Sequence, residues 1–114
     1  MPLRGTAIAA EVRRGRITIA PFVPEQITAQ SYTVRLAPAC MRYVDLELDA
    51  RRVPPAEEFT LPAAGALLQP GHIYLAHTVE TIGGLQYAMT LDALSAVSAL
   101  GIWVQFSAPL GHIG

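Results

Sequence analysis

The chain has 114 residues, a formal net charge of −1 and a single cysteine, and 52% of its residues are apolar. This length fits one domain over residues 1–114, and the apolar content is high enough for folding rather than disorder. The near-zero net charge provides no basic field for nucleic acid or for an anionic membrane surface. Cys40 has no partner for an internal disulfide, and no apolar run reaches the ~18 residues that span a membrane. We therefore expect a cytoplasmic protein without membrane contact.

A short helix is indicated near the start of the chain. Ile8 and Val12 lie one helical turn apart, and two arginines follow where a helix C-terminus favours cations. Thr6 belongs to the residue types that cap a helix N-terminus through a side-chain oxygen. Gly15 can adopt the left-handed conformation that ends a helix. The sequence thus predicts one N-terminal helix between Thr6 and Gly15.

From residue 16 onward the pattern is typical of short β-strands separated by proline and glycine. Alternating polarity and punctuated apolar runs predict extended segments in residues 16–19, 31–36, 45–49, 59–61, 66–69, 72–80 and 85–91. We expect a turn at Gly83 and Gly84, a short helix or turn over residues 92–100, and a final buried strand over residues 101–107 that contains Trp103. This organisation predicts one mostly-β domain of the sandwich, barrel or jelly-roll type.

Motif chemistry is sparse in this sequence. It contains no G-x-G-x-x-G or G-K-[ST] phosphate loop, and one cysteine cannot supply the ligands of a zinc nucleobase deaminase. His72 and His77 are interpreted as ordinary polar histidines, because in a strand they would point to opposite faces, and we assign no metal ligand. Cys40 is interpreted as a small buried apolar residue rather than a nucleophile. The carboxylates of residues 45–49 are interpreted as a solvated sheet face, and Ser95 has no neighbouring histidine for a hydrolase triad.

Three blocks of the chain resemble motifs of the dCTP deaminase family, and they occur in the family's order. Residues 15–36 resemble its G-x-I-x-I-x-P-F opening and the S-Y-D-V-R-L-G stretch that follows. Residues 59–82 resemble the stretch L-x-P-G-x-x-x-L-x-x-T-x-E. Residues 91–108 overlay the segment G-R-S-S-x-x-R-L-G and the strand after it. The chain is thus similar to a dCTP deaminase-like protein of the trimeric dUTPase superfamily.

The resemblance implies a fold, an assembly and a chemistry. The fold would be a β-clip, or distorted jelly-roll, with a short N-terminal helix, and the chain would form a homotrimer with nucleotide sites between subunits. Family members deaminate dCTP to dUTP, and bifunctional members also cleave dUTP to dUMP. A glutamate activates the attacking water without zinc, and arginines and serines hold the triphosphate. No cofactor is required, and Mg²⁺ is expected only on a bound nucleoside triphosphate.

Several of the implied site positions are altered. In the G-R-S-S motif the arginine position is Leu94, the first serine is kept as Ser95, and the second is Ala96. The arginine of R-L-G is Ala99, and a later acidic position is His112. Leucine and alanine offer neither charge nor donors. Losing two charge-assisted contacts of ~1.5–3 kcal/mol each would weaken triphosphate binding by roughly two to four orders of magnitude.

The implied base-binding and catalytic positions lie near the end of the sequence. Phe106, Ser107 and Ala108 fall on the strand whose backbone reads the base, so a slot for a deoxypyrimidine nucleotide could tolerate the side-chain changes. The family's catalytic glutamate would fall beyond Gly114, so we expect a chain truncated at its C-terminus with no catalytic residue. Sheet edges left by the missing strands would be exposed unless trimer contacts cover them.

These departures favour a non-catalytic member of the superfamily. Such a pseudoenzyme would act as a trimeric scaffold or as a regulatory or binding module, with residues 94–100 apolar enough to pack against a partner or another subunit. The alternative is an active hydrolase, either a dCTP deaminase or a dUTP diphosphatase, since the family fold alone does not decide activity. A third interpretation is a decayed or engineered truncation selected for folding or assembly alone.

Overall fold

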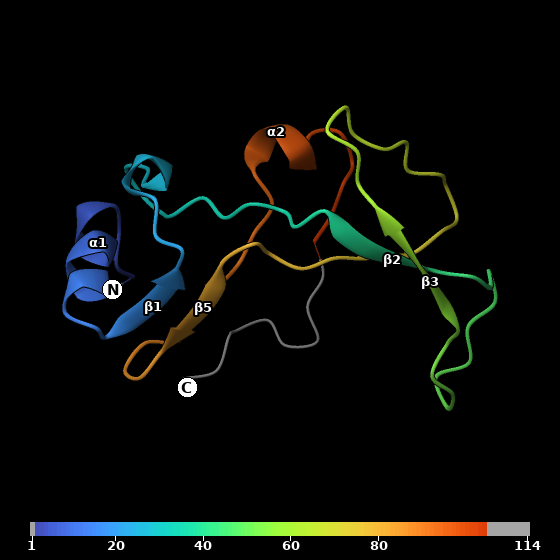
Figure 1. The fold of residues 1–114 in the computed structure, drawn as a ribbon, viewed down its shortest axis with the longest axis horizontal. Helices are drawn as coiled ribbons and strands as arrows, with labels where there is room; N and C mark the ends of the chain where they lie inside the picture. The colour runs from blue at the N-terminus through green and yellow to red at the C-terminus, as the bar shows by residue number, and fades with distance from the viewer. Residues whose placement is uncertain (1, 105–114) are drawn as a thin grey trace. The chain divides into compact units, whose positions relative to one another are not determined.

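The computed structural model describes residues 2–104, and these fall into two compact units. The first unit contains residues 2–33 and 81–104, and the second contains residues 34–80 (Figure 1). Each unit has one antiparallel sheet, of two strands in the first and three in the second. The expected mostly-β architecture with a short N-terminal helix is therefore confirmed.

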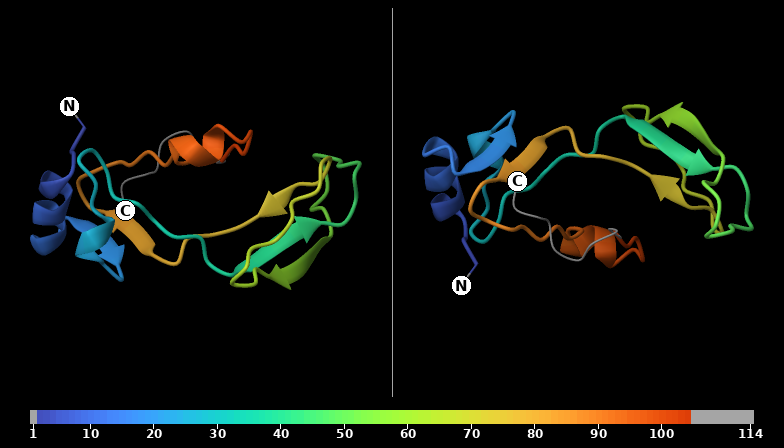
Figure 2. Two further views of the ribbon diagram at one scale, coloured as in Figure 1. Left: turned by 90° about the horizontal axis from the view of Figure 1, so that it is seen from above. Right: turned by 90° about the horizontal axis from the view of Figure 1, so that it is seen from below.

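The first unit is built on a two-stranded sheet. Its elements are α1 (Thr6–Arg13), β1 (Ile17–Ala20), the 3₁₀ turn η1 (Pro24–Gln26), β5 (Thr81–Gly84) and α2 (Ser95–Ser98). Strand β1 pairs antiparallel with β5, and Ile19 lies opposite Ile82. Ile19 is the buried apolar residue of this unit, and α1 lies beside β1 in both Figures 1 and 2. The alternation of Ile17 and Ile19 with polar residues thus forms a strand, as predicted.

The N-terminal helix is confirmed, but its cap is not the one expected. Gly5 precedes the helix with a φ of 48°, and a Cβ there would lie 2.9 Å from the carbonyl oxygen of Ala29. The Thr6 cap was therefore a wrong prediction, because the helix begins one residue earlier on a backbone conformation that suits glycine. At the other end Gly15 has a φ of 73° and provides the expected left-handed stop. No helix in the described residues is long and apolar enough to cross a lipid bilayer.

The second unit is built on a three-stranded sheet with β2 in its centre. The strands are β2 (Ala39–Tyr43), β3 (Ala56–Thr60) and β4 (Tyr74–Leu75), in the order β3-β2-β4, and both pairings are antiparallel. Ala37 and Cys40 are its buried apolar residues. The two ends of the unit pair with each other, since Leu36 bridges Thr78 and the N–H of Ala37 donates to the oxygen of His77 at 2.9 Å.

Two segments that alternate in polarity do not form strands. Residues 31–36 make only isolated bridges, because the chain leaves the first unit after Thr33 and enters the second at Val34. Residues 45–49 lie in the loop between β2 and β3 rather than in a sheet. There the Asp49 carboxylate accepts hydrogen bonds from the backbone N–H and the side chain of Arg51, at 3.0 and 3.1 Å, and this supports the turn.

Other predictions fail where tertiary contacts decide the conformation. Gly83 and Gly84 belong to β5 and not to a turn, since they pair with Thr18 and Ile17 of β1. Residues 66–69 and 85–91 contribute no named strand, and only parts of residues 59–61 and 72–80 do. Residues 101–104 are not a strand, and Trp103 is 87% exposed instead of buried. The short helix predicted within residues 92–100 is confirmed as α2.

Candidate functional site

The positions that the resemblance assigned to triphosphate binding lie in and around α2. Leu94 precedes the helix and Ser95 is its first residue. Ala96 and Ala99 are exposed, as is Ser95, whose hydroxyl makes no hydrogen bond among residues 2–104. A helix of four residues is too short to supply a strong dipole, and none of these side chains carries charge. The positions are accessible, but their chemistry does not suit a polyanion.

The segment of residues 94–104 is apolar and open to solvent. It contains no charged residue. Leu94 is 57% exposed, Leu100 80% and Trp103 87%. A group of large apolar side chains this exposed is typical of a surface that packs against another molecule. We call residues 94–104 the apolar segment.

The base-reading positions cannot be placed. Phe106, Ser107, Ala108 and His112 lie outside the described residues, so the predicted base slot stays a prediction. Of the positions that the resemblance assigns to nucleotide binding, the structure describes those from Leu94 to Ala99.

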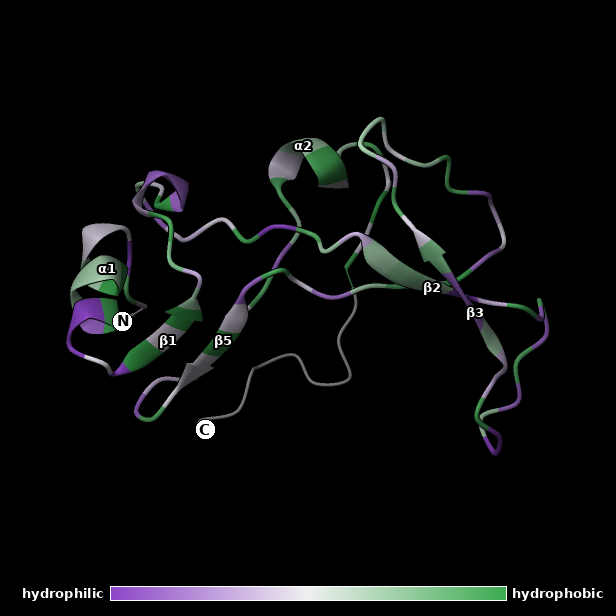
Figure 3. Cartoon of the chain, viewed as in Figure 1, coloured by the Kyte–Doolittle hydropathy of each residue, from purple (hydrophilic) through white to green (hydrophobic). Residues whose placement is uncertain are grey.

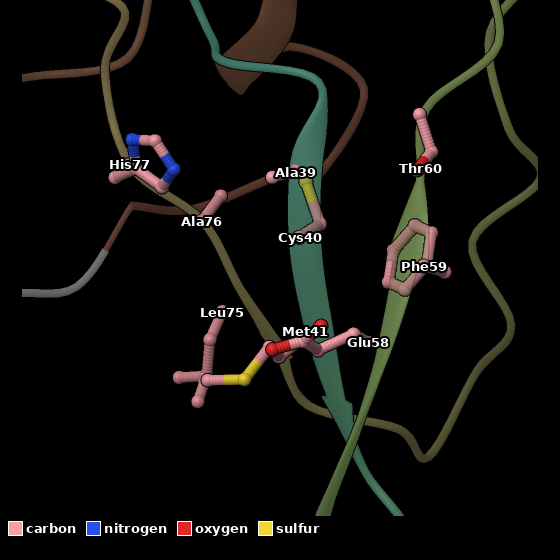
Figure 4. Close-up of a pocket in the computed structure, with 9 residues that line it drawn as sticks. All are labelled: Ala39, Cys40, Met41, Glu58, Phe59, Thr60, Leu75, Ala76 and His77. Carbon is pink, nitrogen blue, oxygen red and sulfur yellow. The ribbon is translucent and has the colours of Figure 1, made fainter.

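A hollow of about 590 Å³ lies on the three-stranded sheet of the second unit. Its lining residues are Ala39, Cys40, Met41, Glu58, Phe59, Thr60, Leu75, Ala76 and His77. Figure 4 shows β2 between β3 on one side and the segment of residues 75–77 on the other. The lining is mainly apolar, and its polar or ionisable side chains include Glu58, His77 and the Cys40 thiol. The sequence did not predict this hollow because it did not predict β2, the strand at its centre.

The polar side chains in and near the hollow contact neighbouring groups and do not gather into a cluster. The Cys40 thiol is buried and lies 3.8 Å from the oxygen of Ala37, which agrees with its interpretation as a buried apolar residue. The Nδ1 of His77 lies 3.0 Å from the oxygen of Thr78. His72 packs near Tyr74 with ring centroids 6.4 Å apart. In the described part of the chain, no three His, Cys, Asp or Glu side chains are grouped to hold a metal ion.

Glu11 is a buried carboxylate in the first unit with three side-chain donors. Arg14 Nη1 donates to its Oε1 at 2.6 Å, and Arg16 Nη1 donates to its Oε2 at 3.3 Å. The Tyr87 hydroxyl donates to the same Oε2 at 3.0 Å. The hydrogen bond from Arg14, aided by Tyr87 and Arg16, holds the pKa of Glu11 below its ordinary value of about 4.5, although burial opposes the shift. Glu11 is therefore ionised at neutral pH.

Glu80 is the corresponding carboxylate of the second unit. Its side chain is 0% exposed, and it accepts hydrogen bonds from the backbone N–H of Arg35 at 2.9 Å and from Arg35 Nε at 2.8 Å. These bonds join residues at opposite ends of the unit. From the sequence, Glu80 stood out only as the acidic position of a family stretch, because its partner Arg35 lies 45 residues away. Glu11 was missed, although its spacing of three residues from Arg14 is a local signal for an ion pair; its third donor, Tyr87, lies 76 residues away.

The two antiparallel sheets with an N-terminal helix are consistent with the dUTPase-like class of β fold. The dCTP deaminase-like family matches residues 3–114 of the chain. The chain belongs to the dCTP deaminase-like family, as the resemblance of its three sequence blocks predicted.

Three relatives illustrate the similarity, each called "dCTP deaminase, dUMP-forming". The protein of Hathewaya histolytica is 34% identical over 98 residues, which cover 86% of this chain and 57% of the relative. That of Cytophaga hutchinsonii is 31% identical with the same coverage. That of Leptospira biflexa serovar Patoc is 30% identical, with 86% of this chain and 56% of the relative covered. The match thus spans a little over half the length of these relatives.

Proposed function

We propose that this chain is a non-catalytic member of the family and that it acts as a subunit of a homotrimeric scaffold or binding module. The observation that supports the proposal is the apolar segment, which carries no charge at the positions where the resemblance places triphosphate ligands. Its large side chains are exposed to solvent in the single chain. A surface of this kind is suited to packing against protein and unsuited to holding phosphate.

The first part of the proposal concerns nucleotide binding. Two arginines of the family motif are replaced by Leu94 and Ala99, and one serine by Ala96. Because two charge-assisted contacts are lost, triphosphate affinity should fall by roughly two to four orders of magnitude. Mg²⁺ would then have no bound triphosphate to neutralise. Ser95 alone offers one hydroxyl, which cannot offset the lost charges.

The second part concerns assembly. Trp103, Leu100 and Leu94 are each more than half exposed, and covering apolar area contributes about 25 cal/mol per Å². Aromatic residues are also enriched in the centres of protein interfaces. We therefore assign the apolar segment to the contact between subunits.

The assembly is tested by sedimentation of the 114-residue chain and of two variants. The unaltered chain should sediment as a trimer, and the double substitution Leu100→Ser with Trp103→Ser should shift it towards monomer. Val53→Ser is the matched control, since Val53 is 95% exposed but lies in the β2–β3 loop. A monomeric unaltered chain, or equal loss of trimer in the control, would refute the assigned contact.

The non-catalytic part is tested by calorimetry with dCTP and with dUTP in the presence of Mg²⁺. We expect no heat of binding that depends on Ser95, so the unaltered chain and Ser95→Ala should give the same titration up to about 1 mM nucleotide, a range that typically saturates working enzymes. Tight binding that Ser95→Ala abolishes would count against this part of the proposal and would leave the assembly result unaffected.

A second candidate function is an active dCTP deaminase or dUTP diphosphatase. It is supported by the name shared by the similar proteins and by the retained Ser95. The test is incubation of the chain with dCTP or dUTP and Mg²⁺, followed by chromatography of the nucleotides. Turnover that is abolished by Ser95→Ala and kept by Ser98→Ala would establish this function, whereas absence of turnover would exclude it for this chain.

A further inference from the structure

Positive charge is concentrated in the N-terminal part of the chain. Four of the eight arginines lie in residues 4–16, where Glu11 is the only acid, so this stretch carries a net charge of +3. The remaining residues carry −4, with four arginines and eight acids. The net charge of −1 therefore conceals a basic region. Figure 3 shows hydrophilic residues at the end of α1 and at the start of β1.

Two of these arginines are held at fixed points by one carboxylate. Arg14 and Arg16 donate to different oxygens of Glu11, at 2.6 and 3.3 Å, and the carboxylate is buried. Tyr87 donates to the same carboxylate at 3.0 Å and anchors it from the segment after β5. One carboxylate thus presents two guanidinium groups on the same turn, and the three groups together carry a net charge of +1.

The donors of these guanidinium groups are far from exhausted. A guanidinium has five N–H donors, and Arg14 and Arg16 each use a single nitrogen, Nη1, toward Glu11. Their side chains are 61% and 49% exposed. Arg13 is exposed and pairs with no group among residues 2–104. Gly15, between the helix and Arg16, has no neighbouring atom within 4 Å of where a Cβ would stand. The turn is therefore open to a ligand.

We propose that Arg13, Arg14 and Arg16, which we call the arginine turn, bind a phosphoryl dianion. Guanidinium forks match phosphate oxygens in geometry as well as in charge, and bidentate contacts of this kind are the strong ones. The arginine turn carries +3, and together with the ionised Glu11 the net charge is +2, which balances a dianion. The site lies outside the apolar segment, so it stands independently of the proposed loss of triphosphate binding at α2.

A second arginine pair in the chain provides a matched control. Arg51 and Arg52 are also adjacent and also pair with a single carboxylate, that of Asp49. There the carboxylate is 36% exposed, against 7% for Glu11, and the arginines are 89% and 85% exposed. Arg51 already spends two of its nitrogens, Nε and Nη2, on Asp49, whereas Arg14 and Arg16 each spend one on Glu11. The more exposed Asp49 pair is also more strongly screened by solvent and salt. We expect no saturable phosphate binding at this pair.

The test is NMR of the arginine Nε–H groups during titration with inorganic phosphate, with chloride adjusting the ionic strength to a constant value. Saturable shifts are expected at Arg14 and Arg16 and none at Arg51. The double substitution R14Q/R16Q should weaken phosphate binding at least about tenfold, as for loss of charge-assisted contacts. R51Q/R52Q should leave it unchanged. Shifts that do not saturate, or that are equal at both arginine pairs, would overturn the proposal.

Two further measurements keep the test decisive. Because R14Q/R16Q leaves Glu11 without its arginines, R13Q is a second variant that leaves those ion pairs intact, and it should weaken phosphate binding about twofold to threefold by loss of one nearby charge. Unchanged affinity in R13Q, in a chain with an unaltered backbone spectrum, would contradict the proposal.

Titration with dCTP and with deoxycytidine distinguishes the source of the phosphoryl group. Shifts at the arginine turn with dCTP and not with deoxycytidine would extend the site to nucleotides, shifts with phosphate alone would restrict it to the free ion, and shifts with deoxycytidine would refute phosphoryl recognition.

Discussion

Each of the two units contains a buried glutamate that accepts hydrogen bonds from several donors, but the donors differ between the units. Glu11 lies in the first unit and shares its oxygens among two nearby arginines and Tyr87. Glu80 lies in the second unit, and its identified hydrogen-bond donors are the backbone N–H and the Nε of Arg35. The side chain of Glu80 is fully buried, whereas that of Glu11 is 7% exposed.

The difference shows how segments with few fully buried apolar side chains among residues 2–104 can still be held together. Ile19 is the buried apolar residue of the first unit, and Ala37 and Cys40 are those of the second. Packing of so few side chains contributes little to the free energy of unfolding. Charge-assisted hydrogen bonds therefore do more to hold the segments of each unit in place. Glu80 and Arg35 join the ends of a unit that spans residues 34–80, beside the backbone pairing of the same two ends. The contacts of Glu11 are mostly local and partly redundant.

The largest effect is expected for Glu80→Ala. Removing a fully buried carboxylate leaves the Arg35 donors without their acceptor, and we expect a loss of about 2–3 kcal/mol in the free energy of unfolding. Urea denaturation measures this value. Glu58→Ala is the control, because Glu58 is exposed and its side chain makes no ion pair or hydrogen bond in the described residues. Equal effects of the two substitutions would show that the contact between Glu80 and Arg35 does not stabilise the second unit.

A smaller loss is expected for Glu11→Gln. The amide keeps one acceptor oxygen but loses the charge that attracts Arg14 and Arg16. Amide hydrogen exchange should become faster in α1 and β1 while β2 and β3 of the second unit keep their protection. Faster exchange in both units would contradict the view that each glutamate serves its own unit.

The pH dependence should distinguish the two regions through Glu11. The pKa of Glu11 is lower in the folded chain than its ordinary value of about 4.5, so its ionised form stabilises the fold. This contribution is fully present above the ordinary value and is lost as the pH falls through the lowered one. In acid, the unaltered chain should therefore lose stability more steeply than Glu11→Gln. Parallel pH profiles for the two proteins, measured by urea denaturation, would refute this linkage.

The smallest effect is expected for Tyr87→Phe, which deletes one of the three donors to Glu11. The two arginine contacts remain, so the loss should be about 0.5–1.5 kcal/mol, as for a single hydrogen bond. Tyr43→Phe is the matched control, since the Tyr43 hydroxyl makes no hydrogen bond in the described part of the chain. A change in thermal unfolding of the same size in both variants would show that the hydrogen bond from Tyr87 to Glu11 does not stabilise the fold.

The sequence predicted the features that short-range chemistry controls. The apolar spacing of Ile8 and Val12, the glycine stop at Gly15 and the alternation around Ile19 all correspond to elements of the structure. Alternation misled in residues 45–49, because the same pattern occurs in a loop whose leucines stay exposed. The assignment of Leu94 to Ala99 to a triphosphate site stays a prediction from motif spacing, and the exposure of these residues could not be predicted from the sequence.

The sequence by itself determined the family, the strand-rich fold class and the absence of charged residues from Leu94 to Val104, because these depend on local residue type and order. Only the tertiary structure decided which carboxylates hold the units together. Glu80 meets Arg35 across 45 residues and Glu11 meets Tyr87 across 76, and no local pattern marks such pairs. It also decided that Gly83 and Gly84 form part of a strand, because they pair with Thr18 and Ile17 of β1. Burial creates the need for a partner, and the fold determines which partner is within reach.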